Sequence, residues 1–125
     1  MGRNQKKIKD FAKKFNCFVY SNIFRKPVEN LFLINCTPIG MKRTKYSAHI
    51  PFSKKMIENS DIIMDLVNYP PNTKLVKFGK KFGKKTISGS QISLYQIKHQ
   101  FKIYSNKEIS ILNLKKILKK NSLLQ

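Results

Sequence analysis

The order of apolar and polar positions along the chain predicts alternating helices and strands. Apolar residues recur at helical spacing over residues 6–15, with lysines between them, which predicts an amphipathic helix. The short apolar run at residues 17–20 is typical of a strand, and residues 21–30, which contain Pro27, predict a connector. The five residues of Leu31–Asn35 fit a strand that is buried on both faces of a parallel sheet.

Further along the chain, apolar segments alternate with stretches that favour loops. Pro38 and Gly40 predict a loop directly after the strand that ends at Asn35. The later predicted strands cover residues 61–67 and 85–87, and a turn is predicted at Gly89. The later predicted helices are a short one over residues 51–58, one that is capped by Thr73 and closed by Gly83, one over residues 90–104, and a Lys-rich amphipathic helix over residues 109–118. This order predicts an α/β fold with a parallel sheet, whose ligands bind at the carboxyl ends of the strands.

Length and composition are those of a single domain or part of one. The chain has 125 residues, of which 41% are hydrophobic, so it can bury a core without disulfides or metal. Cys17 and Cys36 are too few for a disulfide framework or a four-ligand zinc site, and we expect reduced core thiols. His49 and His99 have no third partner at metal or catalytic spacing. The sequence therefore predicts no metal site.

The net positive charge of the chain indicates a second kind of ligand, polyanions such as nucleic acids. It has 26 Lys plus Arg against 6 Asp plus Glu, a formal net charge of +20, which favours binding to polyanions. Only Arg3, Arg25 and Arg43 are arginines, the better side chain for phosphates and base edges, so we expect nonspecific affinity at most. No apolar run reaches the roughly 20 residues that cross a bilayer, and the polar N-terminus is unlike a signal peptide. We therefore expect a cytoplasmic protein without membrane contact.

Four sequence blocks are similar to signatures of the shikimate dehydrogenases. LINCTPIGM at residues 33–41 resembles the family's NATPIGM strand and loop, and DIIMDLVNYP at residues 61–70 resembles its D-x-V-Y-N-P strand end. SGSQISLYQIKHQF at residues 88–101 resembles G-L-x-M-L-x-x-Q-x-x-x-x-F, and GRNQKK at residues 2–7 resembles the N-R-T turn before a helix. The blocks occur in the family's order.

This resemblance implies a fold and a domain organisation. Residues 1–106 would be a partial NADP-binding Rossmann domain, and residues 107–125 would be the Lys-rich helix that completes it. The sheet would be an incomplete Rossmann-like parallel sheet flanked by helices, without the first strand and the glycine-rich loop, since the sequence contains no GxGxxG. The chain would thus be the C-terminal portion of a truncated shikimate dehydrogenase.

The resemblance also implies an activity and its partners. Shikimate dehydrogenases reduce 3-dehydroshikimate to shikimate with NADPH, in the biosynthesis of chorismate and aromatic amino acids. The family's catalytic Lys and Asp lie in an N-terminal substrate domain, so no residue here takes a catalytic role and we expect the chain to be inactive alone. A separate fragment with that substrate domain is a candidate partner. The alternative is a small basic protein that binds nucleic acid or assembles with a complementary fragment.

The resemblance of the matched blocks implies binding roles for individual residues. Arg3 corresponds to the residue that grips the 2′-phosphate of NADP, Leu66 to an apolar neighbour of the nicotinamide, and Gln96 to an amide that binds substrate hydroxyls. Asn68 stands where the family has a tyrosine that contacts substrate. The implied NADP-binding residues are Gly2, Arg3, Asn4, Gln5, Lys6, Lys7, Thr37, Leu66 and Gly89, and the implied substrate-binding residues are Asn68 and Gln96. Read without the resemblance, Arg3 is a solvated charge, Gly89 serves turn geometry and Gln96 is an exposed spacer.

Overall fold

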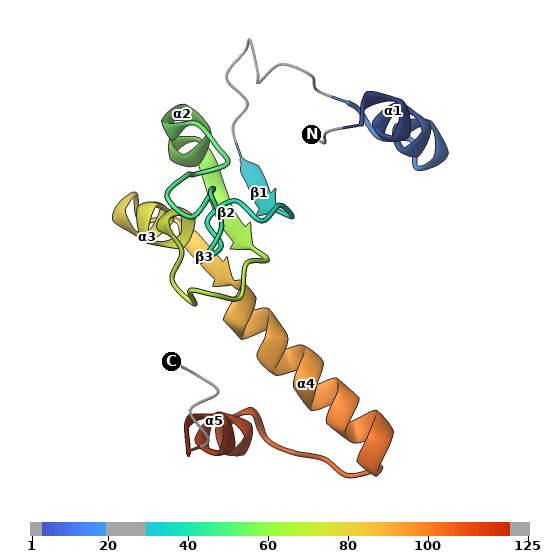
Figure 1. Cartoon of the computed structure of the whole chain (residues 1–125), viewed down its shortest axis with the longest axis vertical. Helices are drawn as coiled ribbons and strands as arrows, with labels where there is room; N and C mark the ends of the chain where they lie inside the picture. The colour runs from blue at the N-terminus through green and yellow to red at the C-terminus, as the bar shows by residue number, and fades with distance from the viewer. Residues whose placement is uncertain (1–3, 20–29, 121–125) are drawn as a thin grey trace.

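Eight helices and strands make up the described part of the chain (Figure 1). The computed structural model describes residues 4–19 and 30–120. In chain order the elements are α1 (Gln5–Lys14), β1 (Leu31–Asn35), α2 (Lys54–Glu58), β2 (Ser60–Asp65), α3 (Lys74–Lys81), β3 (Lys85–Ser88), α4 (Gly89–Ser105) and α5 (Ile111–Lys120). The predicted succession of strands and helices is confirmed from β1 to α5.

The three strands form one parallel sheet in the order β1-β2-β3. Helix α2 connects β1 to β2, and α3 connects β2 to β3, as parallel pairing requires. A bulge interrupts the first pair, because Leu31 lies opposite Ser60 whereas Phe32 lies opposite Ile62. The predicted α/β class with a parallel sheet is confirmed.

The core lies between one face of the sheet and the helices α2 and α3. It is formed by Leu33 on β1, Met56 and Ile57 on α2, Ile63 on β2 and Leu75 on α3. Helix α3 begins after Thr73, whose hydroxyl accepts a hydrogen bond from the Val76 N–H, as the sequence predicts. Gly79 brings α3 close to the sheet, since a Cβ there would lie 2.8 Å from the Ile63 Cδ1.

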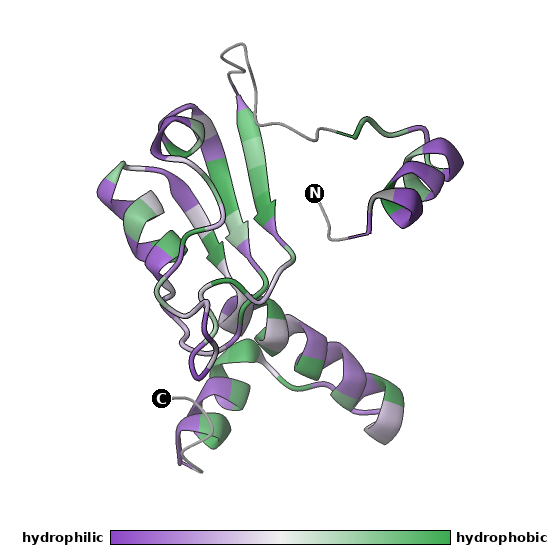
Figure 2. Cartoon of the chain, turned by 45° about the horizontal axis from the view of Figure 1, so that its top comes forward, coloured by the Kyte–Doolittle hydropathy of each residue, from purple (hydrophilic) through white to green (hydrophobic). Residues whose placement is uncertain are grey.

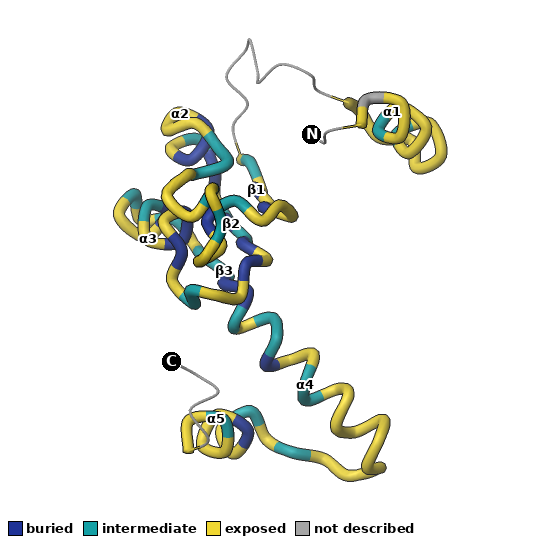
Figure 3. Tube along the Cα trace, viewed as in Figure 1, coloured by how far each residue is buried: buried dark blue, intermediate teal, exposed yellow. Residues whose placement is uncertain are grey.

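The opposite face of the sheet is much less covered. Phe32 is 51% exposed and Ile34 is 45% exposed, so the prediction that β1 is buried on both faces is wrong. The physical reason is that β1 lies at the edge of the sheet, with α2 and α3 packed on the Leu33 side only. Figure 2 shows β1 and β2 as largely hydrophobic, whereas most of β3 is hydrophilic. The burial of β1 alternates along the strand (Figure 3).

Helix α4 follows β3 without a loop. The Ser88 hydroxyl accepts from the Gln91 N–H, and the Gln91 side chain accepts from the Ser88 N–H, so the two residues form a capping box. The prediction of a turn at Gly89 is therefore wrong, because this cap starts the helix at Gly89 itself. Helix α5 packs against the long helix α4 and buries Leu114.

Helix α1 matches its predicted range, but the segment after it does not form a strand. Asn4 caps α1 by accepting a hydrogen bond from the Lys7 N–H. Residues 17–19 pair with no strand within the described chain, and Tyr20 lies outside it. An extended apolar segment needs a neighbouring strand to satisfy its backbone, and no described strand lies beside these residues; the Cys17 N–H donates to the Ala12 carbonyl of α1 instead. No helix among residues 4–19 and 30–120 has the length and apolarity to cross a bilayer.

Candidate functional site

A buried carboxylate joins the carboxyl ends of β1 and β2 to the start of α3. Asp65 accepts hydrogen bonds from the Asn35 Nδ2 at 2.9 Å, from the Val67 N–H at 3.1 Å and from the Thr73 hydroxyl at 2.5 Å. Asn35, Asp65 and Thr73 are all at most 1% exposed. Asn35 ends β1, Val67 lies in the loop after β2 and Thr73 caps α3, so the carboxylate holds three chain segments at one edge of the sheet.

The loop after β1 is wound around the Asn35 side chain. The Asn35 Oδ1 accepts from the Thr37 N–H at 3.0 Å and from its hydroxyl at 2.7 Å, while the Asn35 Nδ2 also donates to the Ile39 carbonyl. The Thr37 hydroxyl in turn accepts from the Ile39 N–H. Gly40 follows with a φ of +92°, a value that glycine adopts readily. The loop is thus shaped by contacts within the chain.

The loop after β2 contacts both the first loop and α4. The Lys42 N–H donates to the Tyr69 carbonyl at 2.9 Å, and the Lys42 ammonium donates to the Tyr69 hydroxyl at 3.1 Å. This hydrogen bond and the charge of Lys42, aided by the charge of Arg43, lower the pKa of the exposed Tyr69 phenol. The Asn68 Oδ1 accepts a hydrogen bond of 2.7 Å from the Ser93 hydroxyl on α4.

Gly89 lies directly against the loop after β2. A Cβ at this position would lie 2.4 Å from the Val67 carbonyl oxygen and 2.9 Å from that of Leu66. Packing within the chain therefore explains why a glycine stands here. Leu66 itself is 43% exposed, and it continues the β2 strand at the same edge.

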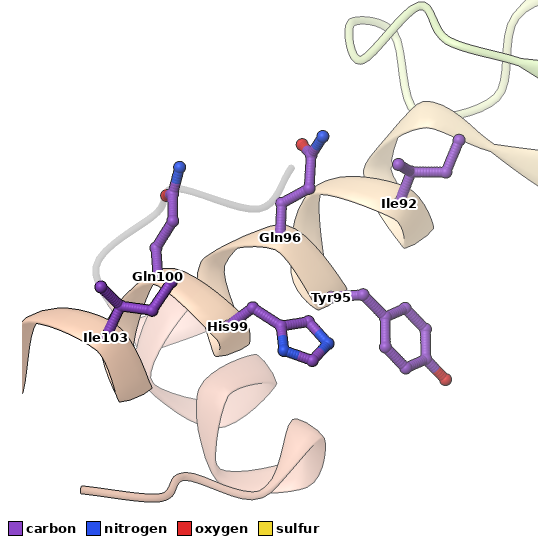
Figure 4. Close-up of a pocket in the computed structure, with 6 residues that line it drawn as sticks. All are labelled: Ile92, Tyr95, Gln96, His99, Gln100 and Ile103. Carbon is purple, nitrogen blue, oxygen red and sulfur yellow. The ribbon is translucent and has the colours of Figure 1, made fainter. Parts of the chain in front are cut away.

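A shallow groove runs along one side of α4 (Figure 4). It has a volume of about 520 Å³ and is lined by Ile92, Tyr95, Gln96, His99, Gln100 and Ile103. Gln96 and Gln100 point away from Tyr95 and His99, as the close-up shows. The predicted helix over residues 90–104 is confirmed, and the groove on its surface is open. Gln96 lies seven residues after Gly89, roughly 10 Å along the helix, and lines no surface with the strand-end loops.

The structure brings together some of the residues that the sequence singled out. Thr37, Leu66, Asn68 and Gly89 gather at the carboxyl edge of the sheet. Asn4, Gln5, Lys6 and Lys7 belong to the start of α1, which lies apart from the sheet in Figure 1. Gly2 and Arg3 fall outside the described residues.

The sequence interpretation missed the residues that hold this edge together. Asn35, Asp65, Lys42 and Tyr69 make most of its polar contacts. Two signals could have found Asn35 and Asp65: each is a polar residue at the end of an apolar strand, and each stands at the first position of a matched signature, NATPIGM or D-x-V-Y-N-P. Cys17 and Cys36 are free thiols but exposed, so the prediction of core thiols is wrong: both follow the end of an element and face solvent. No three His, Cys, Asp or Glu residues cluster at metal-binding geometry within the described ranges.

This geometry defines a class of protein. Parallel strands joined by helices, with converging loops at their carboxyl ends, form the ligand-binding edge of an open α/β sheet. No protein-family model matches the chain.

Comparison with known proteins finds similarity to shikimate dehydrogenases in sequence and in structure. The chain is 35% identical to a shikimate dehydrogenase-like protein of Haemophilus influenzae over 78 residues, 62% of this chain and 29% of the relative. The structure of a shikimate 5-dehydrogenase-like protein matches with a TM-score of 0.81 and 28% identity over 90% of this chain and 42% of the other. A shikimate dehydrogenase solved with NADP+ matches with a TM-score of 0.56 and 33% identity, over 72% of this chain and 31% of the other.

The resemblance indicated by the four sequence blocks is thereby confirmed, and so is the Rossmann-like character of the sheet. The chain has shikimate dehydrogenase homologues in sequence and in structure. It spans less than half the length of each of these three proteins.

Proposed function

We propose that this chain forms part of the NADP(H) site of a reductase of the shikimate dehydrogenase type, acting on 3-dehydroshikimate and shikimate. The observation that carries the proposal is the convergence of the loops after β1 and β2 and the start of α4 at one edge of a parallel sheet. These are the segments that match the family's blocks in sequence. Ligands of open α/β sheets bind at this edge.

The residues at the edge have the chemistry that a dinucleotide needs. Leu66 offers an exposed apolar surface suited to one face of the nicotinamide ring, and Thr37 and Gly89 border it from the two neighbouring strand ends. Arg3, Lys6 and Lys7 would supply positive charge for the 2′-phosphate, and the neighbouring Gly2, Asn4 and Gln5 would complete this part of the cofactor site. NADPH, when bound, supplies the hydride of the reaction.

On the substrate side we propose contacts from Asn68 and Gln96. Asn68 already accepts a hydrogen bond from Ser93, which fixes its amide and leaves the NH₂ group to donate. Proton transfer to a carbonyl requires a positioned acid, and we assign none to this chain. The chain should therefore bind cofactor without catalysing turnover by itself.

The domain organisation belongs to the same proposal. Residues 1–106 would form the partial cofactor domain and residues 107–125 its closing helix, which is supported by the packing of α5 on α4. We also propose a cytoplasmic location, since the exposed thiols of Cys17 and Cys36 suit a reducing compartment. A separate polypeptide with the substrate domain would be the partner that completes activity.

Titration calorimetry of the full chain with NADPH and NADH tests this function. We expect binding that favours NADPH, loss of that preference in R3A, and weaker binding in L66D. Leu112→Asp is the matched control, because Leu112 is exposed on α5 and distant from the proposed site. Absence of NADPH binding would contradict the cofactor proposal, and turnover of 3-dehydroshikimate at an ordinary rate by the chain alone would contradict the absence of a catalytic residue.

A further inference from the structure

Lysines gather on the helices that cover one face of the sheet. Half of the residues in the range 74–85 are lysines, and none is Asp or Glu. All but one of these lysines are exposed, and the remaining one is half-buried. Neither of the two ion pairs in the described part of the chain includes them. They are Lys74, Lys77, Lys80, Lys81, Lys84 and Lys85. Their positive charge is therefore available to an external anion.

Helix α2 extends this charge on the same side of the sheet. Its Lys54 and Lys55 are exposed, and α2 and α3 pack on the same core (Figure 1). Two contacts join α2 to the end of α3. The Lys54 ammonium lies 5.8 Å from the centre of the Phe82 ring, and the Lys84 ammonium donates to the Glu58 carbonyl at 2.6 Å. We call the lysines of α2 and of residues 74–85 together the basic surface.

Carboxylates offset little of the charge on the basic surface. Glu58 forms an ion pair with Lys54 at 3.6 Å, Asp61 is exposed near the start of β2, and Asp65 is buried at the other end of that strand. The ammonium groups thus outnumber the exposed carboxylates severalfold, on elements that are fixed to one sheet. Such an array attracts a polyanion and needs little backbone ordering when it binds one.

The type of side chain indicates how the anion is recognised. Lysine is a point charge that binds phosphate, whereas arginine provides the fork that reads base edges, and the basic surface contains no arginine. Lys74, Lys77 and Lys81 recur at helical spacing on α3 and span roughly 10 Å of its length. Duplex DNA presents one phosphate charge per roughly 1.7 Å of its axis. The basic surface therefore suits a phosphate backbone and not a base sequence.

We propose that the basic surface binds the phosphate backbone of a nucleic-acid duplex, independently of base sequence. Lysines on α1 and α5 add a weaker attraction that depends on net charge alone. This binding is separate from the proposed cofactor site, which lies at the carboxyl ends of the strands. The basic surface instead covers the two helices and reaches Lys85 at the amino end of β3.

Fluorescence anisotropy with a labelled duplex DNA of mixed sequence tests the location of binding. The variant K77Q/K81Q removes two exposed charges that lie four residues apart on α3. It should weaken binding by about tenfold near about 100 mM salt and lower the slope of log affinity against log salt by about 2, because each phosphate contact contributes roughly 0.9 to that slope. A second duplex of unrelated sequence should bind equally well.

K115Q/K119Q is the matched control, because Lys115 and Lys119 are exposed on α5 with the same spacing. It removes the same charge and should weaken binding by less than about threefold. Circular dichroism verifies that both variants keep their helices. Absence of binding at about 50 mM salt overturns the proposal. Equal weakening by the two variants also overturns it, since binding would then follow net charge alone, and so does a marked preference for one of the two duplexes.

Amine acetylation followed by mass spectrometry locates the duplex on the unaltered chain. The duplex should slow acetylation of Lys77 and Lys81 more than that of Lys115 and Lys119, and excess NADPH should not remove this protection. Protection confined to other lysines overturns the proposal. Displacement of the duplex by NADPH overturns it too, because the duplex would then occupy the cofactor site. A chain that binds duplex DNA in this way but binds no NADPH would support this inference and contradict the proposed function.

Discussion

At the level of single residues, the carboxyl edge of the sheet depends on the Asp65 carboxylate. None of its hydrogen-bond donors is a cation. Asp65 is fully buried, and its partners Asn35, Val67 and Thr73 donate as an amide, a backbone N–H and a hydroxyl. A buried carboxylate is costly unless it is hydrogen-bonded, and here three donors bond to its two oxygens. The order of loops at the sheet edge therefore follows from a few side chains, of which Asn35 and Asp65 stand in the matched sequence blocks and Thr73 does not.

The pair of Lys42 and Tyr69 leads to a prediction about titration. The Lys42 ammonium donates to the Tyr69 hydroxyl and favours its ionised form, so the pKa of the Tyr69 phenol should lie below its ordinary value. Lys42→Met should move the pKa of Tyr69 upward. Absorbance at the tyrosinate band, followed against pH, measures this change, and Tyr69→Phe identifies the transition.

Lys45→Met is the control for this titration. Lys45 lies over the ring of Tyr46 in the same loop, without a hydrogen bond to Tyr69. It should leave the Tyr69 transition in place. A Tyr69 pKa that does not respond to Lys42→Met would show that the ammonium contact is absent in solution.

At the level of elements, hydrophobic periodicity and capping residues predicted most of the fold. Leu31–Asn35 is a strand as expected, and Thr73 caps α3 as expected, because both depend on local sequence. The errors concern properties set by distant parts of the chain. Residues 17–19 need a neighbouring strand that the sequence does not indicate, and the exposure of Phe32 follows from the position of β1 at the sheet edge.

The two glycines that bring helices close to the sheet should respond differently to alanine. Gly89→Ala places a Cβ 2.4 Å from the backbone carbonyl of Val67, whereas Gly79→Ala meets the Ile63 Cδ1 at 2.8 Å, at the end of a side chain that can turn. We expect Gly89→Ala to lower the free energy of unfolding by roughly 1–3 kcal/mol. Gly79→Ala should cost less, since alanine also favours the helix.

Urea denaturation followed by circular dichroism compares the two variants. Equal losses of stability would contradict the close contact between Gly89 and Val67. The comparison also bears on the cofactor assignment, because a large loss in Gly89→Ala would give this glycine a structural reason apart from any ligand.

At the level of the whole molecule, the sequence predicted the edge of the sheet that carries the site but not all of its members. Thr37, Leu66 and Asn68 could be placed there because they follow strand ends, where parallel strands bring their loops together. Gln96, which the resemblance placed with the substrate-binding residues, lies instead on the long helix α4 away from the strand ends, because the direction of this helix is set by the Ser88 cap and by the close approach of Gly89 to Val67. Motif spacing does not encode that direction.

The net charge predicts how the molecule interacts with nucleic acids. We expect affinity for duplex DNA and RNA that is independent of sequence and falls roughly tenfold to hundredfold between about 50 and about 200 mM salt. Fluorescence anisotropy measures this dependence. The triple variants K9Q/K13Q/K14Q on α1 and K115Q/K116Q/K119Q on α5 should weaken binding to a similar degree, because the charge is spread along the chain. Loss of binding in only one of the two variants would instead reveal a dedicated site.

The polar end of β1 also determines how that strand aligns. The first four residues of β1 are all apolar: Leu31, Phe32, Leu33 and Ile34. A shift of β1 by one residue along β2 would therefore replace one apolar face by another at little cost in free energy. Asn35 breaks this degeneracy, because only one alignment delivers its amide to the Asp65 carboxylate. The bulge at Leu31 absorbs the mismatch at the other end of the strand. Asn35 thus fixes the register of β1 against β2, and without it β1 could pair with β2 in several registers of nearly equal free energy.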